Sequence, residues 1–552
     1  MTVFSRLLGK AMKLPAAQSH AVKVERDLKI PMPDGVVLLA DRYVPAGGGG
    51  PLVLVRSPYG RSNMFGTLFG TLFAERGLQV LLQSCRGTFG SQGRFDPFAE
   101  RADGLATVAW MREQDWYPGS FGTAGPSYLG MVQWAIAGEV GPELKAMAAL
   151  VTTSDPHAMM FGGGSFSLET SLVWITMLAN QERRLALFRQ RSLSRKLRPL
   201  FASLPLDRLD SQATGHDVIP WQEWLEHSGA DDEFWTARRY SDGRPTVGAA
   251  VSLVGGWYDI FLPGQIDDYM ALRAAGHEPY LLIGPWQHTD TDGMAASIRE
   301  SVAWLRARLL DDASQLRQAP VRIYVGGVGE WRDLPSWPPE STGQRWHLQA
   351  DGGLHPDPAE ASTPDSYTYD PADPTPSVGG PILSASAGRI SAPPDNRDLE
   401  ARADVLTYTS APLDRDLAVI GQVTADLVVA SSLEHTDFFV RLCDVDQSGR
   451  SAGVCDALRR VTPGQPAGEA DGTIKLTIEL WPTAHVFAAG HKIRLQVSSG
   501  AHPRFARNPG SGEPLGSATT LKSADQQIYH DPGHPSAVVL PVTSAPSISG
   551  SR

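Results

Sequence analysis

A serine between a short apolar strand and a helix is the first candidate for chemistry. The segment G-P-S-Y-L-G runs from Gly125 to Gly130 and follows a predicted strand, Phe121–Gly125. Small residues at such a tight turn hold the serine Oγ at the carboxyl end of a sheet, as in a nucleophile elbow. Leu129 stands where the usual G-x-S-x-G pattern has its second glycine, and Gly130 comes one place later. The context predicts Ser127 as a nucleophile, with a structural serine–glycine turn as the alternative.

An aspartate and a histidine follow two later strands. Asp259 ends the segment G-G-W-Y-D after the predicted strand Ala249–Val254, and His288 ends G-P-W-Q-H after the predicted strand Tyr280–Ile283. Active sites of open α/β sheets lie outside the carboxyl ends of the strands. The chain order serine, aspartate, histidine is the order that α/β-hydrolases use. The three positions together predict a Ser–His–Asp triad.

The elements that must position these residues alternate between strand and helix. A β-hairpin is predicted over Val22–Val44, around the turn P-D-G. Further predicted strands are Leu52–Val55, Leu78–Leu82, Met147–Val151 and Val321–Val325. The predicted helices are Met64–Glu75, Phe98–Glu113, Tyr128–Ala137, Gln265–Ala275 and Ala295–Leu310. This alternation predicts a parallel sheet with helices on both faces.

Two regions depart from the alternation. Residues 156–240 are helical and carry an arginine-rich stretch, 183–198, which we expect to be a solvated helix face. Their place between two strands predicts a cap or lid. Residues 355–400 are rich in Pro, Ser, Asp and Gly, and strand-like runs of period two follow them, which predicts a β-sandwich. We therefore expect a catalytic domain (1–155 and 241–340), a helical cap (156–240), and an extended connection with a β-sandwich (341–552).

Composition narrows the class of protein. The 552 residues carry a net charge of −11, with 42% hydrophobic and 20% charged residues, which is typical of globular proteins and unlike a nucleic-acid binder. No stretch is long and apolar enough to span a membrane. Three cysteines cannot form a disulfide scaffold, which favours a reducing, cytoplasmic location. The basic first twenty residues lack the apolar run of a signal peptide, so we expect a short helix on the body of the protein, with a targeting segment as the alternative.

Several segments resemble the cocaine esterase / X-Pro dipeptidyl-peptidase / α-amino-acid ester hydrolase family of serine hydrolases (CocE/NonD type). In that family the nucleophile elbow has the sequence pattern G-x-S-Y-x-G, which accounts for the displaced glycine. The shared segments, from about Val22 to past Asn508, are R-S-P-Y-G (56–60), C-R-G-T-F-G-S-Q-G-R-F (85–95), G-G-W-Y-D, G-P-W-Q-H, L-T-Y-T-S-A-P-L (406–413) and H-V-F-A-A-G-H-K-I-R-L-Q-V-S-S (485–499). The resemblance implies an α/β-hydrolase core with a helical cap and a C-terminal all-β jelly-roll domain of the galactose-binding-like type.

The resemblance also implies a role for each site residue. Ser127 would be the nucleophile, His288 the general base and then acid, and Asp259 the group that orients His288. The oxyanion hole would consist of the backbone N–H of Tyr128 and the hydroxyl of Tyr59. Neither a cofactor nor a metal is implied.

The substrate is less constrained. We expect aromatic walls from Trp174, Trp257, Phe261 and Trp286, with Phe261 and Trp174 first among them. Ester hydrolysis is the first choice, and a small-molecule ester or peptide-like compound the expected substrate. An X-Pro dipeptidyl-peptidase or an α-amino-acid ester hydrolase would need a carboxylate for the substrate's ammonium group, for which Glu169 is a candidate. A scaffold that binds carbohydrate or protein is the non-enzymatic alternative, and the sequence leaves a homodimer open.

Overall fold

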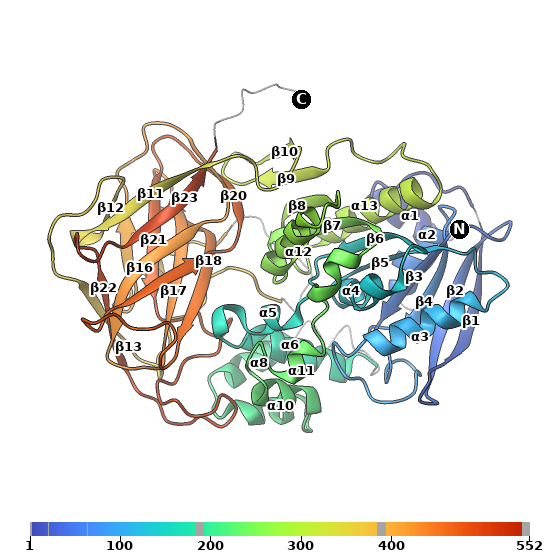
Figure 1. The fold of residues 1–552 in the computed structure, drawn as a ribbon, viewed down its shortest axis with the longest axis horizontal. Coiled ribbons are helices and arrows are strands. Elements are labelled where there is room, and N and C mark those ends of the chain that lie inside the picture. The colour runs from blue at the N-terminus through green and yellow to red at the C-terminus, as the bar shows by residue number, and fades with distance from the viewer. Residues whose placement is uncertain (1–2, 20, 63, 183–192, 384–392, 544–552) are drawn as a thin grey trace.

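A ten-stranded mixed sheet with its covering helices forms one side of the molecule, and an all-β region forms the other (Figure 1). The structure is a computed structural model and describes residues 3–19, 21–62, 64–182, 193–383 and 393–543. The strands follow the order β1-β2-β4-β3-β5-β6-β7-β8-β9-β10. Their bounds are β1 Val22–Pro31, β2 Val37–Pro45, β3 Leu52–Ser57, β4 Gln79–Ser84, β5 Phe121–Pro126, β6 Leu144–Leu150, β7 Ala250–Tyr258, β8 Tyr280–Gln287, β9 Val321–Val325 and β10 Glu330–Leu334. Neighbouring strands from β4 to β9 in this order are parallel, whereas β1, β2 and β10 are antiparallel additions at the two edges.

Helices cover both faces of this sheet, as the alternating pattern predicts. Leu52 and Leu54 of β3 point to one core, whereas Val53 and Val55 point to the other. The first core also contains side chains of α3 (Arg101–Arg112), α4 (Tyr128–Val140) and α12 (Leu262–Ala274). The second core contains side chains of η1 (Gly66–Thr71), α2 (Leu72–Ala74) and α13 (Thr291–Leu309). The N-terminal helix α1 (Val3–Ala11) packs there through Leu8 and through a hydrogen bond of 2.6 Å from Ser5 Oγ to Glu75 Oε1.

Strands β7 and β8 are longer than the sequence predicts. Both continue through their glycine-containing motifs, to Tyr258 and to Gln287. A Cβ at Gly256 would lie 2.2 Å from the carbonyl oxygen of Trp286, so the two backbones approach more closely there than a side chain would allow. The glycines therefore permit the strands to pair, instead of ending them.

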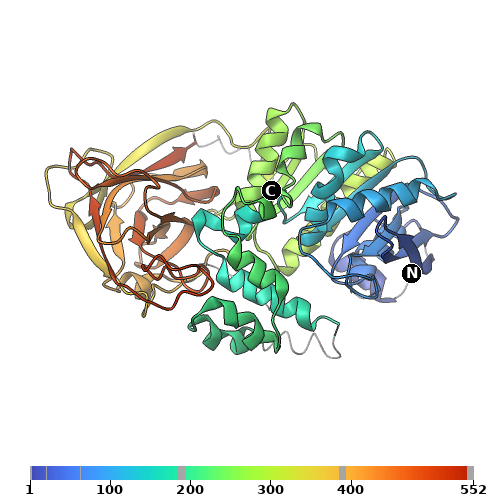
Figure 2. The same cartoon turned by 60° about the horizontal axis from the view of Figure 1, so that its bottom comes forward.

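The segment between β6 and β7 forms the helical cap, which lies between the sheet and the C-terminal region (Figures 1 and 2). The helices of its described residues are α5 Pro156–Met160, η2 Gly162–Gly164, α6 Leu168–Asn180, α8 Leu193–Phe201, η3 Leu206–Arg208, α9 Leu209–Thr214, α10 Ile219–Glu226 and α11 Glu233–Thr236, and the short helix η4 Ser241–Thr246 then leads to β7. Stacked aromatic rings hold the cap on the catalytic sheet. The rings of Trp174 and Trp224 lie 5.7 Å apart and nearly parallel, and Phe98 stacks on both. Of the arginine-rich stretch, residues 183–192 lie outside the described part, and Lys196 and Arg198 of α8 are exposed as expected.

In its described residues the C-terminal region is all β apart from two short helices, and thirteen strands there are joined by hydrogen bonds into one folded-over sheet. The strands are β11 Thr342–Gln349, β12 Gly353–His355, β13 Asp365–Tyr369, β14 Leu406–Thr409, β15 Leu417–Gly421, β16 Thr424–Ser431, β17 Thr436–Val445, β18 Ser451–Val461, β19 Ile474–Glu479, β20 Thr483–Phe487, β21 Lys492–Ser498, β22 Ala524–Tyr529 and β23 Ala537–Val542; the helices are η5 Ala350–Gly352 and α14 Arg397–Glu400. Strand β19 alternates between buried and exposed residues, as predicted. Strand β17 is buried along its whole length, because one of its faces joins the sandwich core and the other lies toward the cap and the catalytic sheet.

Candidate active site

Ser127 lies at a sharp turn between β5 and α4. Its φ of 57° and ψ of −124° are unusual for a residue with a side chain and mark local backbone strain. Its backbone N–H donates to the carbonyl of Leu150 at 2.9 Å, and the N–H groups of Gly130 and Met131 donate to its own carbonyl. The turn is therefore tied to the neighbouring strand and to the helix that follows it.

Two glycines make room for this turn. A Cβ at Gly125, whose φ is +148°, would lie 2.4 Å from the Cβ of Leu129. A Cβ at Gly130 would lie 2.5 Å from Thr152, whose hydroxyl donates to the carbonyl of Ser127 at 2.8 Å. The displaced second glycine of the motif thus lets α4 pack against the end of β6.

The structure brings Ser127, His288 and Asp259 together. Asp259 follows β7 directly and His288 follows β8 directly, at the same edge of the sheet as the serine. His288 Nε2 lies 3.0 Å from Ser127 Oγ, and His288 Nδ1 lies 2.8 Å from Asp259 Oδ2. The side chain of Asp259 is 1% exposed and that of His288 is 9% exposed. The other oxygen of Asp259 accepts the backbone N–H of Phe261 at 2.8 Å, which fixes the carboxylate. This chain of hydrogen bonds can move a proton from the serine hydroxyl to the imidazole.

Tyr59 lies beside the serine, two residues after the end of β3. The indole N–H of Trp174, from the cap helix α6, donates to the Tyr59 hydroxyl oxygen at 3.1 Å. Burial raises the pKa of Tyr59 to about 12, and hydrogen bonding to the side chains of Trp174 and Ser127 opposes that rise. The hydroxyl is therefore protonated near neutral pH and lies between the cap and the serine.

Tyr128 begins α4, and the first N–H groups of a helix have no acceptor within the helix itself. A buried network holds this residue in place. Its hydroxyl donates to Glu100 Oε1 at 2.7 Å, and Glu100 Oε2 accepts from the guanidinium of Arg56 at 2.6 Å. The backbone N–H of Phe98 donates back to the Tyr128 hydroxyl at 2.9 Å. Burial, and then the charge of Glu100, raises the pKa of Tyr128 well above its ordinary value.

Glu100 lies outside the motifs that the sequence offers as candidates for the site. Its backbone N–H donates to the Tyr240 hydroxyl oxygen at 3.0 Å, so the network also reaches the end of the cap. Arg56 belongs to the shared motif R-S-P-Y-G, but nothing in the sequence links it to a carboxylate 44 positions later. The pairing arises only when α3 and β3 pack together.

Of the four aromatic residues expected in the substrate pocket, one contacts a triad residue and one contacts Tyr59. The ring of Phe261 is 5.3 Å from the His288 ring, and Trp174 reaches Tyr59. Trp257 instead donates its indole N–H to the carbonyl of Tyr324 and packs on Trp337. Trp286 belongs to the core on the other face of the sheet and lies against Trp331.

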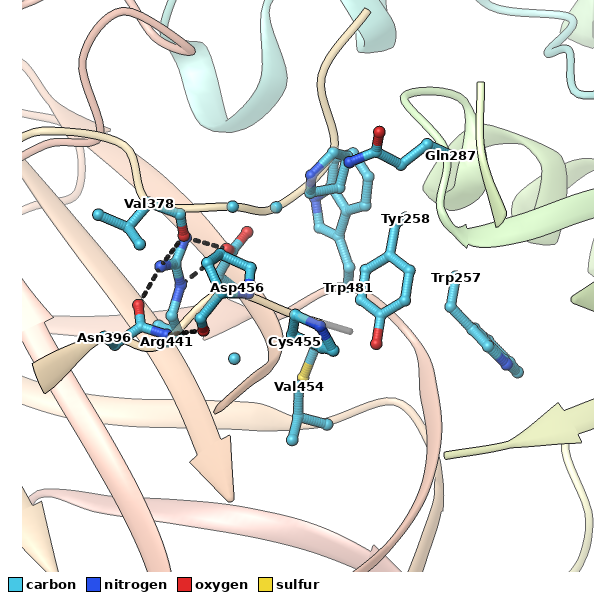
Figure 3. A pocket seen from close by; sticks show the side chains of 16 residues that line it. Trp257, Tyr258, Gln287, Val378, Asn396, Arg441, Val454, Cys455, Asp456 and Trp481 are labelled. Carbon is cyan, nitrogen blue, oxygen red and sulfur yellow. Dashed lines mark hydrogen bonds and ion pairs between the residues drawn. The ribbon is translucent and has the colours of Figure 1, made fainter. Parts of the chain in front are cut away.

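A cavity of about 260 Å³ lies between the catalytic sheet and the sandwich, here called the interdomain cavity (Figure 3). Tyr258 and Gln287, each one residue before a triad member, form its wall on the catalytic side together with Trp257. Trp481 lines it as well, and Arg441 with Asp456 forms its polar wall. Their ion pair measures 2.9 Å, and Arg441 also binds the carbonyl of Val378 and the side chain of Asn396. The expected aromatic residue Trp257 therefore belongs to this cavity and not to the triad.

Glu169 lies in the first turn of α6, and its backbone N–H donates to the carbonyl of Pro503 at 3.0 Å. Trp174 is five positions further along the helix, which places the two side chains about 140° apart around the helix axis. Burial raises the pKa of Glu169, and Arg504 opposes that effect. The carboxylate thus belongs to the contact between cap and sandwich, whereas Trp174 contacts Tyr59 beside Ser127.

Within the described residues, no group of three or more His, Cys, Asp or Glu side chains is arranged to hold a metal ion. Among the same residues, no helix is long and apolar enough to cross a membrane.

The sheet order, the elbow and the inserted cap define an α/β-hydrolase-type enzyme fold with an additional all-β domain. Residues 34–290 match the X-Pro dipeptidyl-peptidase (S15) family, and residues 314–539 match the X-Pro dipeptidyl-peptidase C-terminal non-catalytic domain. The cocaine esterase of Rhodococcus sp. (strain MB1 Bresler) is 31% identical to this chain over 575 aligned positions, which cover 94% of the chain and 98% of that protein. The chain belongs to this family of cocaine esterase and X-Pro dipeptidyl-peptidase hydrolases, as its motifs predict.

Solved structures agree on the fold. An aminopeptidase from a marine sediment archaeon, Thaumarchaeota archaeon, has a TM-score of 0.79 at 22% identity and covers 95% of this chain and 97% of its own. An α-amino acid ester hydrolase has a TM-score of 0.79 at 24% identity and covers 96% of this chain and 98% of its own. The fold class predicted from the sequence is therefore confirmed for both regions.

Proposed function

We propose that this protein is a serine carboxylesterase that hydrolyses its substrate through an acyl-enzyme. The observation that carries the proposal is the continuous chain of hydrogen bonds from Ser127 through His288 to the buried Asp259, with the serine in a strained elbow. We assign the reaction to residues 1–155 and 241–340, with 156–240 as the cap and 341–552 as the connection and sandwich.

In the first half of the reaction, Ser127 Oγ attacks the ester carbonyl while His288 Nε2 takes the hydroxyl proton. The positive imidazolium is stabilised by Asp259, which is held in place by the N–H of Phe261. The carbonyl oxygen becomes an oxyanion, and collapse of the tetrahedral intermediate breaks the bond to the alcohol, which leaves with the proton from His288. Water then attacks the acyl-enzyme by the same route and releases the acid.

The oxyanion needs two hydrogen-bond donors aimed at the carbonyl oxygen. The N–H of Tyr128 is one, because it stands at the start of α4 directly after the nucleophile. The Tyr59 hydroxyl is the other. Trp174 donates to the oxygen of that hydroxyl, which leaves the hydroxyl proton to be directed to the side of Ser127. Trp174 and Phe261 are also the side chains that we place nearest the substrate.

An X-Pro dipeptidyl-peptidase or an α-amino-acid ester hydrolase is the second candidate, because the family includes both activities. Either activity would need an anion near the triad to hold the substrate's ammonium group. Glu169 lies toward the sandwich and away from the side of α6 that carries Trp174, which favours the simple esterase.

Steady-state hydrolysis of p-nitrophenyl butyrate, compared with Ala-Pro- and Gly-Pro-p-nitroanilide, tests the proposal. We expect ester turnover that disappears in Ser127→Ala, and no cleavage of either anilide. Cleavage of the anilides at a comparable rate would make the protein a dipeptidyl-peptidase. Ester turnover that persists in folded Ser127→Ala would contradict the triad itself.

A further inference from the structure

A second cavity, of about 310 Å³, lies between the cap and the sandwich and is here called the cap–sandwich cavity. Cap residues form its apolar side, among them Phe161, Leu168 and Leu206. Strand β18 contributes Arg460 to the wall, and residues of the loop 502–518 form another part of it. The triad residues are not among its lining residues. The cavity is within the size range of small-molecule sites.

Two arginines line this cavity, and they differ in their partners. Arg460 forms a bidentate ion pair with Asp437, with both N–O distances at 2.8 Å, and Asn508 donates to the same carboxylate at 2.9 Å. Arg507 binds the carbonyl oxygens of Pro371 and Phe201, at 3.0 and 3.2 Å. Among the described residues it has no carboxylate partner. Burial lowers the pKa of Arg507, because the charged guanidinium is less stable where it is removed from water and has no counter-ion.

Other polar groups around Arg507 do not neutralise it. Burial, and then the charge of Arg507, lowers the pKa of His502 to about 4, so this imidazole is neutral at pH 7. The hydroxyl of Tyr369 lies near both arginines and has no hydrogen-bond partner within the described part of the chain. Glu513 lines the cavity as well, but it is only partly buried and is bonded to Ser511 and Thr520. The cavity wall therefore includes one guanidinium, that of Arg507, with no carboxylate partner among the described residues, beside an apolar wall.

We propose that the cap–sandwich cavity binds a monocarboxylate with an apolar body, such as a medium-chain carboxylic acid. The carboxylate would pair with Arg507, since a guanidinium offers a carboxylate two parallel donors. The apolar body would lie on Phe161, Leu168 and Leu206. A ligand with a single negative charge matches a single unpaired guanidinium. A phosphate would bring more charge and would meet Glu513 at the rim.

The test is calorimetric titration of octanoate into the full-length Ser127→Ala protein at pH 7, in which catalysis plays no part. We expect one-to-one binding that is weakened about tenfold or more in Arg507→Gln, because a charge-assisted hydrogen bond is lost. Arg415 is an exposed arginine of the sandwich, so Arg415→Gln is the matched control and should bind like the parent. Glu513→Gln should tighten binding about two- to fivefold, because it removes a partly exposed repelling charge.

Two further ligands and one further variant separate the outcomes. Octanamide has the same apolar body without the charge and should bind much more weakly than octanoate, and inorganic phosphate should not compete. Arg507→Lys keeps the charge, so it should retain part of the affinity even if Arg507→Gln proves unstable. Binding of octanoate that is indifferent to both Arg507 variants would place the acid elsewhere, for example at the triad, and would overturn the proposal. Absence of binding, or equal binding of octanamide or phosphate, would overturn it as well.

Discussion

The described part of the chain contains two sets of serine, histidine and aspartate joined by hydrogen bonds, one at the ten-stranded sheet and one in the sandwich. In the sandwich, Ser362 Oγ lies 2.9 Å from His530 Nδ1, and His530 Nε2 lies 3.1 Å from Asp365 Oδ2. These distances are close to those of the set at the catalytic sheet. The residue types and spacings therefore do not by themselves separate a catalytic site from a structural one.

Three physical differences separate them. The imidazole is reversed: at the sheet Nε2 faces the serine and Nδ1 the aspartate, whereas His530 presents Nδ1 to Ser362. The two aspartates also differ in burial, because the side chain of Asp259 is 1% exposed whereas that of Asp365 is 32% exposed. Finally, Ser127 has a positive φ, the start of a helix and the Tyr59 hydroxyl beside it, whereas Ser362 is not among the described residues with positive φ. We infer that the elbow and the oxyanion donors, rather than the three residue types, mark the catalytic set.

Replacement of the two serines should give the largest contrast. Ser127→Ala should lower kcat for p-nitrophenyl butyrate by about 10⁶, because the nucleophile is lost. Ser362→Ala should leave kcat unchanged. A fluorophosphonate should label the peptide that contains Ser127 and not the one that contains Ser362. Labelling of Ser362 would break the comparison.

Replacement of the two aspartates tests the roles of burial and ring orientation. Asp259→Asn should lower kcat by about 10⁴, because His288 would then be held in the wrong tautomer. Asp365→Asn should not change kcat, since Asp365 and His530 join β13 to the end of β22 within the sandwich. Steady-state kinetics on both folded variants measures the contrast, and a comparable loss in Asp365→Asn would mean that the sandwich set takes part in the reaction.

The oxyanion donors should have a smaller effect than the triad. Tyr59→Phe keeps the ring and removes the hydroxyl, and we expect kcat to fall about 10²–10³-fold. KM should change little, because the hydroxyl acts on the charge that develops in the transition state. Circular dichroism controls for the fold. A variant with unchanged kcat would remove Tyr59 from the mechanism and would leave Tyr128 as the remaining donor.

The sequence predicts the positions of the triad well because each member follows a strand of one parallel sheet. Such strand ends meet at one edge whatever the details of packing. It predicts the pocket less well. Trp257 and Trp286 each stand two residues before a triad member, but alternate side chains of a strand point to opposite faces, and proximity in sequence does not show which core a tryptophan enters.

Long-range hydrogen bonds lie beyond sequence reasoning in this chain. The Arg56–Glu100–Tyr128 network joins residues from three elements, and neither its spacing nor its residue types form a local pattern. The same holds for His530 and Ser362, which are 168 residues apart. The hydrogen bond between Trp174 and Tyr59 could not be predicted either, because the sequence suggests only an aromatic pocket wall for Trp174 and does not indicate that its indole N–H is a donor to Tyr59.

That bond gives the smallest of the expected effects and separates positioning from packing. Trp174→Phe keeps an aromatic ring against Phe98 and Trp224 but removes the indole N–H that donates to Tyr59. One hydrogen bond of about 1 kcal/mol corresponds to a loss of kcat of about five- to tenfold. If Trp174 acts by orienting the hydroxyl, the loss should vanish in the Tyr59→Phe background, since there is then no hydroxyl to orient. If it acts as a pocket wall, the loss should appear mainly in KM and should persist in the double variant. A double-mutant cycle on kcat and KM therefore decides whether the cap supplies only a surface or also sets the oxyanion donor, a role for which the Ser362 set has no counterpart.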